Sequence, residues 1–209
     1  ISKCSFVVIG GYAVNAYTLP RFSVDCDIVV KNSSEAYKIG EELSLIGYFK
    51  AKDAKLDYGG LFVRHEKEIN DNLLVSMDIL ISEVSDRLSG AKFTEEWIFK
   101  NSSLSLLRGK TISEELKARI INIDALLVLK ICCCRSTDIR DVFMLLPDAK
   151  NLAWIKEEVA ERCNFKERIE LILKKTSDAK FKNNLQGVYG YIDNPVYNKL
   201  LTAIELLQE

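Results

Sequence analysis

Two aspartates inside one apolar strand constrain the fold of this chain more than any other feature. Residues Val24–Val30 read VDCDIVV, a composition that predicts a buried strand. Because side chains alternate along a strand, Asp25 and Asp27 share one face, while Cys26 and Ile28 point the other way into a core. Two carboxylates on one face repel each other unless a positive group lies between them. The strand therefore needs a face that is either solvated or built to bind a cation.

A pair of glycines precedes this strand. Ser5–Ile9 predicts a short buried strand, which Gly10 and Gly11 interrupt. Tyr12–Thr18 then predicts a brief helix that ends before Pro20. A strand, two glycines and a helix start place backbone N–H groups where an anion can approach closely. The order of elements thus predicts an anion site at the end of the aspartate pocket.

A third carboxylate lies in a later apolar strand. Leu73–Ile81 reads LLVSMDILI and contains Asp78, whereas Asp57 and Asp71, the other candidates in this region, stand beside turn residues. Three carboxylates suit a hard cation such as Mg²⁺, which takes oxygen ligands, and two-metal sites hold the attacking and leaving oxygens of phosphoryl transfer. The alternative is an edge strand whose aspartates are merely solvated.

A polar seam is predicted further along the chain. The run Asp124–Leu146 predicts a single helix, which a following proline stops. On a continuous helix Lys130, Asp138 and Asp141 share one face. Arg135 lies off this seam, about 140° from the lysine at helical spacing. The alternative is an ordinary amphipathic helix with internal ion pairs.

The remaining pattern divides the chain into a mixed part and a helical part. Helices are predicted at Ser33–Ile46, Asn151–Arg162, Asn164–Lys175 and Pro195–Leu207, extended segments at Leu61–His65, Trp97–Asn101 and Leu104–Leu107, and loops at Asp86–Phe93 and Ser177–Asp193. The predicted fold class is α+β: a mixed sheet flanked by helices, followed by a helical C-terminal part. The predicted domains are residues 1–121 and 122–209.

Composition narrows the classes of protein. The chain has 209 residues and a net charge of −1, and it has no apolar run near the roughly 20 residues that a membrane span needs. Near-neutral charge gives no overall attraction to nucleic acid or to an anionic membrane. Either a local basic patch for RNA or an ordinary solvated face is predicted at Lys166, Lys174, Lys175, Lys180 and Lys182.

Three residue types carry little functional signal. The six cysteines include no CxxC pair, which predicts buried thiols in a reducing, cytoplasmic setting. The single histidine, His65, is predicted at a strand end on the surface or in a turn, so a histidine-rich zinc site or a Ser-His-Asp triad has little support. Trp97 and Trp154 are predicted to be core residues.

Two stretches resemble a known superfamily. IGGYAVNAYTLPRFSVDCDIVV is similar to the first motif of the DNA polymerase β-type nucleotidyltransferases: Gly followed by Gly or Ser, a helix, then Asp-x-Asp on the next strand. An Arg four residues before the first Asp and Ser23 in the Thr/Ser position make the AbiEii-like minimal nucleotidyltransferases, which include toxins of toxin–antitoxin systems, the most similar group. The run NIDALLVLKICCCRSTDIRDVFMLL is similar to that group's second motif. Together the resemblance covers about Ser5–Leu146.

The resemblance implies transfer of a nucleoside monophosphate from an NTP to an acceptor, with two Mg²⁺ ions. It assigns the triphosphate to Gly10 and Gly11, the metals to Asp25, Asp27 and Asp78, and the phosphates to Lys130, with Asp138 or Asp141 orienting that lysine or acting on the acceptor. Asp78 would also activate the acceptor hydroxyl. Arg21 is expected either to contact phosphate or to pair with Asp25.

The sequence supports three functional hypotheses. The first is a cytoplasmic Mg²⁺-dependent nucleotidyltransferase whose acceptor is tRNA, a protein hydroxyl or a small molecule. The second is a non-catalytic antitoxin or nucleotide-binding regulatory module of the same fold. The third is an unrelated α+β domain whose Asp-x-Asp is a surface feature. No membrane partner is expected, and the sequence indicates neither the acceptor nor the oligomeric state.

Overall fold

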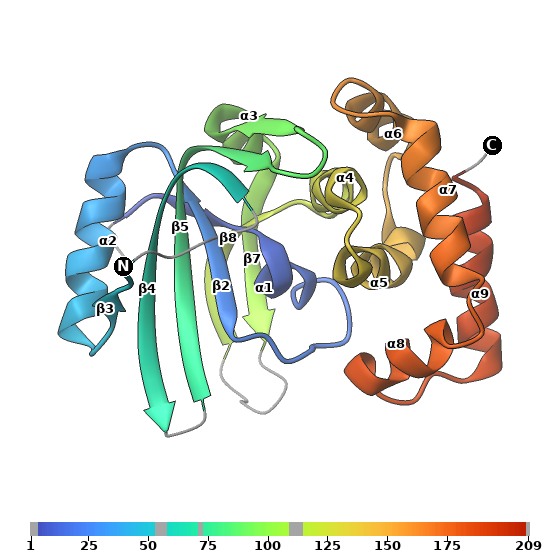
Figure 1. Cartoon of the computed structure of the whole chain (residues 1–209), viewed down its shortest axis with the longest axis horizontal. Helices are drawn as coiled ribbons and strands as arrows, with labels where there is room; N and C mark the ends of the chain where they lie inside the picture. Colours follow the sequence, from blue (N-terminus) through green and yellow to red (C-terminus); the bar gives the residue numbers. More distant parts are fainter. Residues whose placement is uncertain (1–3, 53–57, 71–72, 109–114, 208–209) are drawn as a thin grey trace.

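A computed structural model describes residues 4–52, 58–70, 73–108 and 115–207. Figure 1 shows a twisted sheet with helix α2 at one end of the molecule, helices α6–α9 at the other, and α4 and α5 between the sheet and these outer helices. The strands are β1 (Phe6–Val8), β2 (Asp25–Val30), β3 (Phe49–Lys50), β4 (Tyr58–Asn70), β5 (Leu73–Asp86), β6 (Lys92–Thr94), β7 (Ser102–Arg108) and β8 (Glu115–Ile121). The helices are α1 (Gly10–Val14), α2 (Ser33–Leu45), α3 (Glu95–Lys100), α4 (Ile123–Cys133), α5 (Ser136–Leu145), α6 (Leu152–Ala160), α7 (Phe165–Thr176), α8 (Phe181–Tyr189) and α9 (Asn194–Glu205).

The sheet is mixed, as predicted. Its strand order is β3-β4-β5-β2-β1-β8-β7, and β6 pairs with the C-terminal part of β5. Strand β2 runs parallel to β5 and antiparallel to β1, while β1 runs parallel to β8. The predicted α+β class, a mixed sheet flanked by helices and followed by C-terminal helices, is confirmed.

Helix α4 occupies the middle of the molecule. Ten of its eleven residues are buried, which agrees with a helix that is apolar on all sides. One continuous cluster of buried apolar side chains extends from the sheet, through α4, to α9. The predicted domain boundary at 121/122 falls between β8 and α4 and stays a prediction.

The predicted single helix over Asp124–Leu146 is wrong. The chain leaves α4 at Cys134, whose φ of 53° is left-handed, and α5 begins one residue after Arg135. A left-handed residue at this position is a common way to end a helix, usually with glycine. No glycine or proline marks the break in this sequence, so the periodicity runs through it.

Two further predictions are corrected. Trp97–Asn101 is not extended, because the Thr94 side chain accepts a hydrogen bond from the Trp97 N–H and starts α3. Ser177–Asp193 is not all loop, because it contains α8. Residues Phe181, Leu185 and Tyr189 are buried along one face of this helix, at a spacing of four.

His65 is also corrected. It lies within β4, is buried, and faces Gly40 of α2 rather than the surface. The predicted core positions of the tryptophans agree with their packing, since Trp97 and Trp154 stack with ring centroids 6.1 Å apart beside the main core. All six cysteines are free thiols. Asp57 and Asp71, the alternative third acids, lie outside the described residues.

Candidate active site

Strand register brings two of the predicted acids together. On the parallel pair β2 and β5, Asp27 lies directly opposite Asp78, and Asp25 lies opposite Ser76. On the antiparallel pair β4 and β5, Arg64 lies directly opposite Asp78. Residues in register across a sheet point to the same face, so these side chains share one surface. The site is therefore a row of charges across three adjacent strands, positive, negative and negative.

Arg64 holds Asp78 with both arms of its guanidinium. Its Nε donates to Oδ1 at 2.6 Å and its Nη2 donates to Oδ2 at 2.7 Å, while the Asp78 side chain is only 2% exposed. Such a bidentate pair fixes the geometry of both groups. The pKa of Arg64 is raised above its ordinary value, chiefly by the hydrogen bonds to Asp78. Arg64 was not among the predicted site residues, although it lies in the strand predicted over Leu61–His65.

Asp25 lies at the open side of this row. Its carboxylate is 52% exposed, accepts a hydrogen bond of 2.6 Å from the Ser76 hydroxyl, and lies 3.9 Å from Arg64. Asp25 is thus held on one oxygen by a neutral donor and remains accessible to a ligand.

Asp27 is the unsatisfied member of the row. Among the described residues, no side chain donates a hydrogen bond to its carboxylate or forms an ion pair with it. Burial, together with the negative charge of Asp78, raises the pKa of Asp27 to about 7, and the charges of Lys130 and Arg64 offset this only in part. The Asp27 carboxylate is therefore near two cations but has no ion-pair partner of its own among the described side chains.

The two glycines pack against these acids. Gly10, the first residue of α1, has a φ of 62°, and a Cβ there would overlap the Asp27 carboxylate. A Cβ on Gly11 would come within 2.9 Å of the Ser23 hydroxyl and 3.0 Å of the Arg21 guanidinium. Side chains other than hydrogen therefore do not fit at Gly10, and the first N–H groups of α1 have no acceptor inside the helix.

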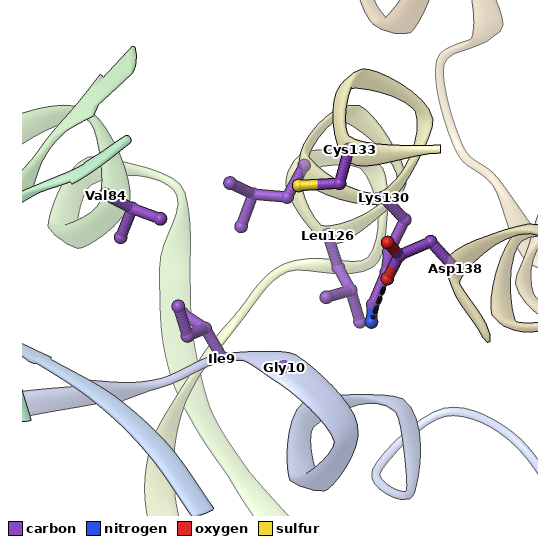
Figure 2. Close-up of a pocket in the computed structure, with 8 residues that line it drawn as sticks. Ile9, Gly10, Val84, Leu126, Lys130, Cys133 and Asp138 are labelled. Carbon is purple, nitrogen blue, oxygen red and sulfur yellow. Dashed lines mark hydrogen bonds and ion pairs between the residues drawn. The ribbon is translucent and has the colours of Figure 1, made fainter. Parts of the chain in front are cut away.

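Lys130 reaches the same place from α4. Its Nζ lies 2.8 Å from Asp138 Oδ1 and 3.0 Å from Asp141 Oδ2, so it bridges two aspartates of α5. Figure 2 shows this ammonium beside Asp138 and close to the start of α1. The grouping of Lys130 with Asp138 and Asp141 was predicted, but on one continuous helix. The structure achieves it by folding α5 back against α4.

Asp141 is the centre of a buried polar network. Besides Lys130, it accepts two hydrogen bonds of 3.0 Å from Arg21 and one of 2.7 Å from the Tyr189 hydroxyl. Burial alone would raise its pKa, but Lys130 and Arg21 bring it below the ordinary value. The predicted pairing of Arg21 with Asp25 is therefore corrected, because Arg21 is bound to Asp141. A contact between Arg21 and phosphate stays a prediction.

A second buried pair fixes the turn between α4 and α5. Arg135 Nη2 lies 2.8 Å from Asp86 at the end of β5, and the Arg135 N–H donates to Asp138 at 3.2 Å. The pKa of Asp86 is lowered although burial opposes this, because Ser89 and Arg135 donate to its carboxylate. The Arg135 side chain thus anchors the turn to the sheet.

Two hollows lie near these residues. The first has a volume of about 10 Å³ and lies between the start of α1, β5, α4 and α5. It is lined by Ile9, Gly10, Val84, Leu126, Leu129, Lys130, Cys133 and Asp138 (Figure 2). That volume suits about one water molecule. The second is an open groove of about 490 Å³ between residues 15–20 and β7, and its lining holds no charged residue. Only the first combines a glycine, a cation and a carboxylate.

The fit to a metal ion differs among the three predicted ligands. In the part of the chain that the structure describes, no three His, Cys, Asp or Glu side chains are arranged to hold one ion. Asp25 and Asp27 fit a hard divalent cation, since both offer carboxylate oxygens on one strand face and Asp27 lacks a cationic partner. Asp78 does not fit as it stands, because Arg64 takes both of its oxygens. The metal roles stay predictions.

Comparison with known proteins gives a likeness of fold. No protein-family model and no curated protein matches the chain. Among solved structures, JHP933 from Helicobacter pylori matches over 99% of this chain and 84% of its own, with 17% identity and a TM-score of 0.49. A candidate nucleotidyltransferase from H. pylori matches over 99% and 87%, with 15% identity and a TM-score of 0.49.

A third match is the lincosamide antibiotic adenylyltransferase LnuA, solved with lincomycin bound. It covers 69% of this chain and 87% of its own, with 18% identity and a TM-score of 0.41. Because all three TM-scores lie below 0.5, these likenesses assign no activity to this chain. Its function is inferred instead from its own residues. None of the described helices is both long and apolar enough to cross a membrane.

Proposed function

We propose that this chain is a Mg²⁺-dependent nucleotidyltransferase that moves a nucleoside monophosphate from an NTP to an acceptor hydroxyl. One observation carries the proposal: Gly10 lies next to residues of both predicted motifs. It packs against the Asp27 carboxylate and lines the same hollow as Lys130 and Asp138. The acids of the first motif and the lysine of the second therefore converge, although they are about a hundred positions apart.

Each residue has a proposed role. Asp25 and Asp27 hold Mg²⁺, which when bound neutralises the triphosphate and polarises the phosphate under attack. Gly10 and Gly11 admit the triphosphate close to the backbone, and Lys130 supplies a positive charge beside it. Asp138 and Asp141 position this lysine, because they hold its ammonium from two sides. Arg21 fixes Asp141 in turn.

The finer assignment also stays a proposal. By its motifs, the chain is an AbiEii-like cytoplasmic enzyme, and such a protein would act as a toxin–antitoxin component on tRNA or on a partner protein. The lysines of α7 and α8 offer a place for RNA, since Lys174 and Lys175 lie together in the last turn of α7.

The test is a transfer assay. The four α-³²P-labelled NTPs are incubated with Mg²⁺, the chain and either total tRNA or cell lysate, and labelled products are separated on gels. We expect label to move to one acceptor class, and Asp27→Asn to abolish this transfer. Asp148→Asn, which changes an exposed aspartate in the turn after α5, is the matched control and should transfer normally.

The pairing of Asp78 with Arg64 favours one second candidate, a non-catalytic nucleotide-binding module. Asp78 would then have a structural role only. This reading predicts that the chain binds NTP, measured by calorimetry, but labels no acceptor under any condition. Such a result with a folded chain would contradict the proposed transfer activity.

A further inference from the structure

Arg64 is the one cation that contacts the row of acids from within the described part of the sheet. It comes from β4, a strand that belongs to neither motif, and it lies in register with Asp78. Its two hydrogen bonds, of 2.6 and 2.7 Å, use both oxygens of Asp78, and its Nη2 also lies 3.9 Å from Asp25. A metal ion bound by Asp78 would need one of its oxygens as a ligand. The Arg64 guanidinium already binds both of them.

The charges on this face are unevenly compensated. Asp78 is neutralised by Arg64, and Asp25 accepts a hydrogen bond from a neutral hydroxyl. Asp27 has no partner among the described side chains. What the row still lacks is positive charge between Asp25 and Asp27, which lie two residues apart on one face of β2. A single divalent cation there would complete the compensation without disturbing Arg64.

We propose that Arg64 limits this site to one divalent cation, held by Asp25 and Asp27, by occupying Asp78 in place of a second ion. The inference rests on the proposed function for its catalytic meaning, but its geometry does not require transfer activity. It makes Arg64 a positioning residue: the guanidinium supplies fixed positive charge, and Asp78 presents no free oxygen to a metal. A guanidinium suits this role because it is always charged and matches a carboxylate in two bonds.

Divalent binding tests this directly, without nucleotide. Mn²⁺ replaces Mg²⁺, because the electron paramagnetic resonance signal of free Mn²⁺ reports how many ions each chain removes from solution. We expect one ion per wild-type chain. Asp27→Asn should weaken its binding by about tenfold or more. Asp78→Asn, in contrast, should weaken binding much less than Asp27→Asn does, because Asp78 is not a ligand.

Removing Arg64 should open a second site. We expect Arg64→Gln to bind two Mn²⁺ ions, and the second ion to be lost again when Asp78→Asn is added. Arg64→Lys keeps a positive charge beside Asp78 and should still bind one ion. It also serves as the folded reference if Arg64→Gln unfolds. Arg87→Gln, which changes an exposed arginine in the turn after β5, is the matched control and should behave as wild type.

Several outcomes would overturn the inference. These are two ions per wild-type chain, an Asp78→Asn chain that loses as much affinity as Asp27→Asn, or a folded Arg64→Gln chain that still binds one ion. Failure of the wild-type chain to bind Mn²⁺ at all would also overturn it. Normal Mn²⁺ binding without transfer to any acceptor would contradict the proposed function and leave the role of Arg64 intact.

Discussion

At the scale of single residues, Asp27 is placed at a cost to stability, whereas Lys130 is held by buried ion pairs. Asp27 faces Asp78 across the β2–β5 pair without a cation of its own, and Lys130 is enclosed by two buried aspartates. Groups arranged this way are common at functional sites, because a ligand supplies what the fold withholds. Both residues therefore lead to measurable consequences for stability as well as for activity.

The raised pKa of Asp27 predicts a pH-dependent stability. Its folded pKa of about 7 exceeds the ordinary value of 3.8, so the folded chain binds this proton more tightly than the unfolded chain does. The stability tied to the proton is fully present below about pH 4 and is lost as pH rises through 7. Asp27→Asn removes this loss, and should be more stable than wild type at pH 8 by about 1–3 kcal/mol.

Urea unfolding at pH 4 and pH 8 without divalent ions measures this difference, which should vanish at the lower pH. Asp148→Asn is the control and should track wild type at both values. Added Mg²⁺ should stabilise wild type at pH 8 and leave Asp27→Asn unchanged. If the stability difference between Asp27→Asn and wild type were the same at pH 4 and pH 8, the raised pKa of Asp27 would not be its cause.

Lys130→Met should destabilise the chain as well as abolish transfer. The substitution leaves Asp138 without its ammonium partner in a buried position, and losing one member of a buried pair costs about 3–5 kcal/mol. Adding Asp138→Asn should restore part of the stability but none of the activity. Urea unfolding and the tRNA labelling assay separate the two effects. If Lys130→Met were as stable as wild type, the ion pairs of Lys130 with Asp138 and Asp141 would contribute nothing to stability.

At the scale of elements, the break between α4 and α5 decides where the second motif points. Cys134 adopts a left-handed conformation with a φ of 53°, which turns α5 back so that Asp138 and Asp141 meet Lys130. The Arg135–Asp86 ion pair then holds the turn against β5. The helix-periodic pattern predicted the correct partners because both a continuous helix and this turn bring residues 130, 138 and 141 near one another.

Glycine at position 134 should suit this turn better than any residue with a Cβ. Left-handed backbone costs residues other than glycine about 1–2 kcal/mol. We therefore expect Cys134→Gly to be more stable than Cys134→Ala by about 1 kcal/mol. Comparing these two variants removes the thiol from both and isolates the backbone effect. Thermal unfolding measures the difference, and a less stable glycine variant would contradict the turn geometry.

At the scale of the whole molecule, the C-terminal helices contribute directly to the site network. The Tyr189 hydroxyl at the end of α8 donates a hydrogen bond of 2.7 Å to Asp141. Asp141 also binds Arg21 from the segment before β2. Elsewhere the Trp97 indole N–H donates a hydrogen bond of 2.8 Å to Glu158 of α6, which joins α3 to the C-terminal helices. Residues from both ends of the sequence thus hold the aspartate that positions Lys130.

Tyr189→Phe tests this link. The substitution removes only a hydroxyl, and a hydrogen bond to a charged group contributes about 1.5–3 kcal/mol, so we expect a loss of that size in urea unfolding. Tyr191→Phe is the matched control, because Tyr191 is 87% exposed, and it should be neutral. A neutral Tyr189→Phe would show that the hydroxyl contributes nothing to holding Asp141.

Much of the frame could be predicted from local pattern. Strands β1, β2 and β5, helix α2 and the mixed-sheet class follow from apolar periodicity, which reports which face of an element is buried. The same alternation correctly placed Asp25 and Asp27 on one face. Helix α3 was not predicted because its start signal, a capping threonine, is weak. Helix α8 was not predicted because the turn residues around it are a stronger local pattern than its buried face.

Local pattern was enough to predict that Asp25 and Asp27 share one strand face, because side chains alternate along a strand, whereas Lys130 was assigned to the same site only by the family resemblance. The partners of these residues follow only from how the whole chain folds. Register between β4 and β5 sets Arg64 on Asp78, and the fold of α8 sets Tyr189 on Asp141. Such pairings depend on how strands align and helices pack over long separations, which no local pattern encodes.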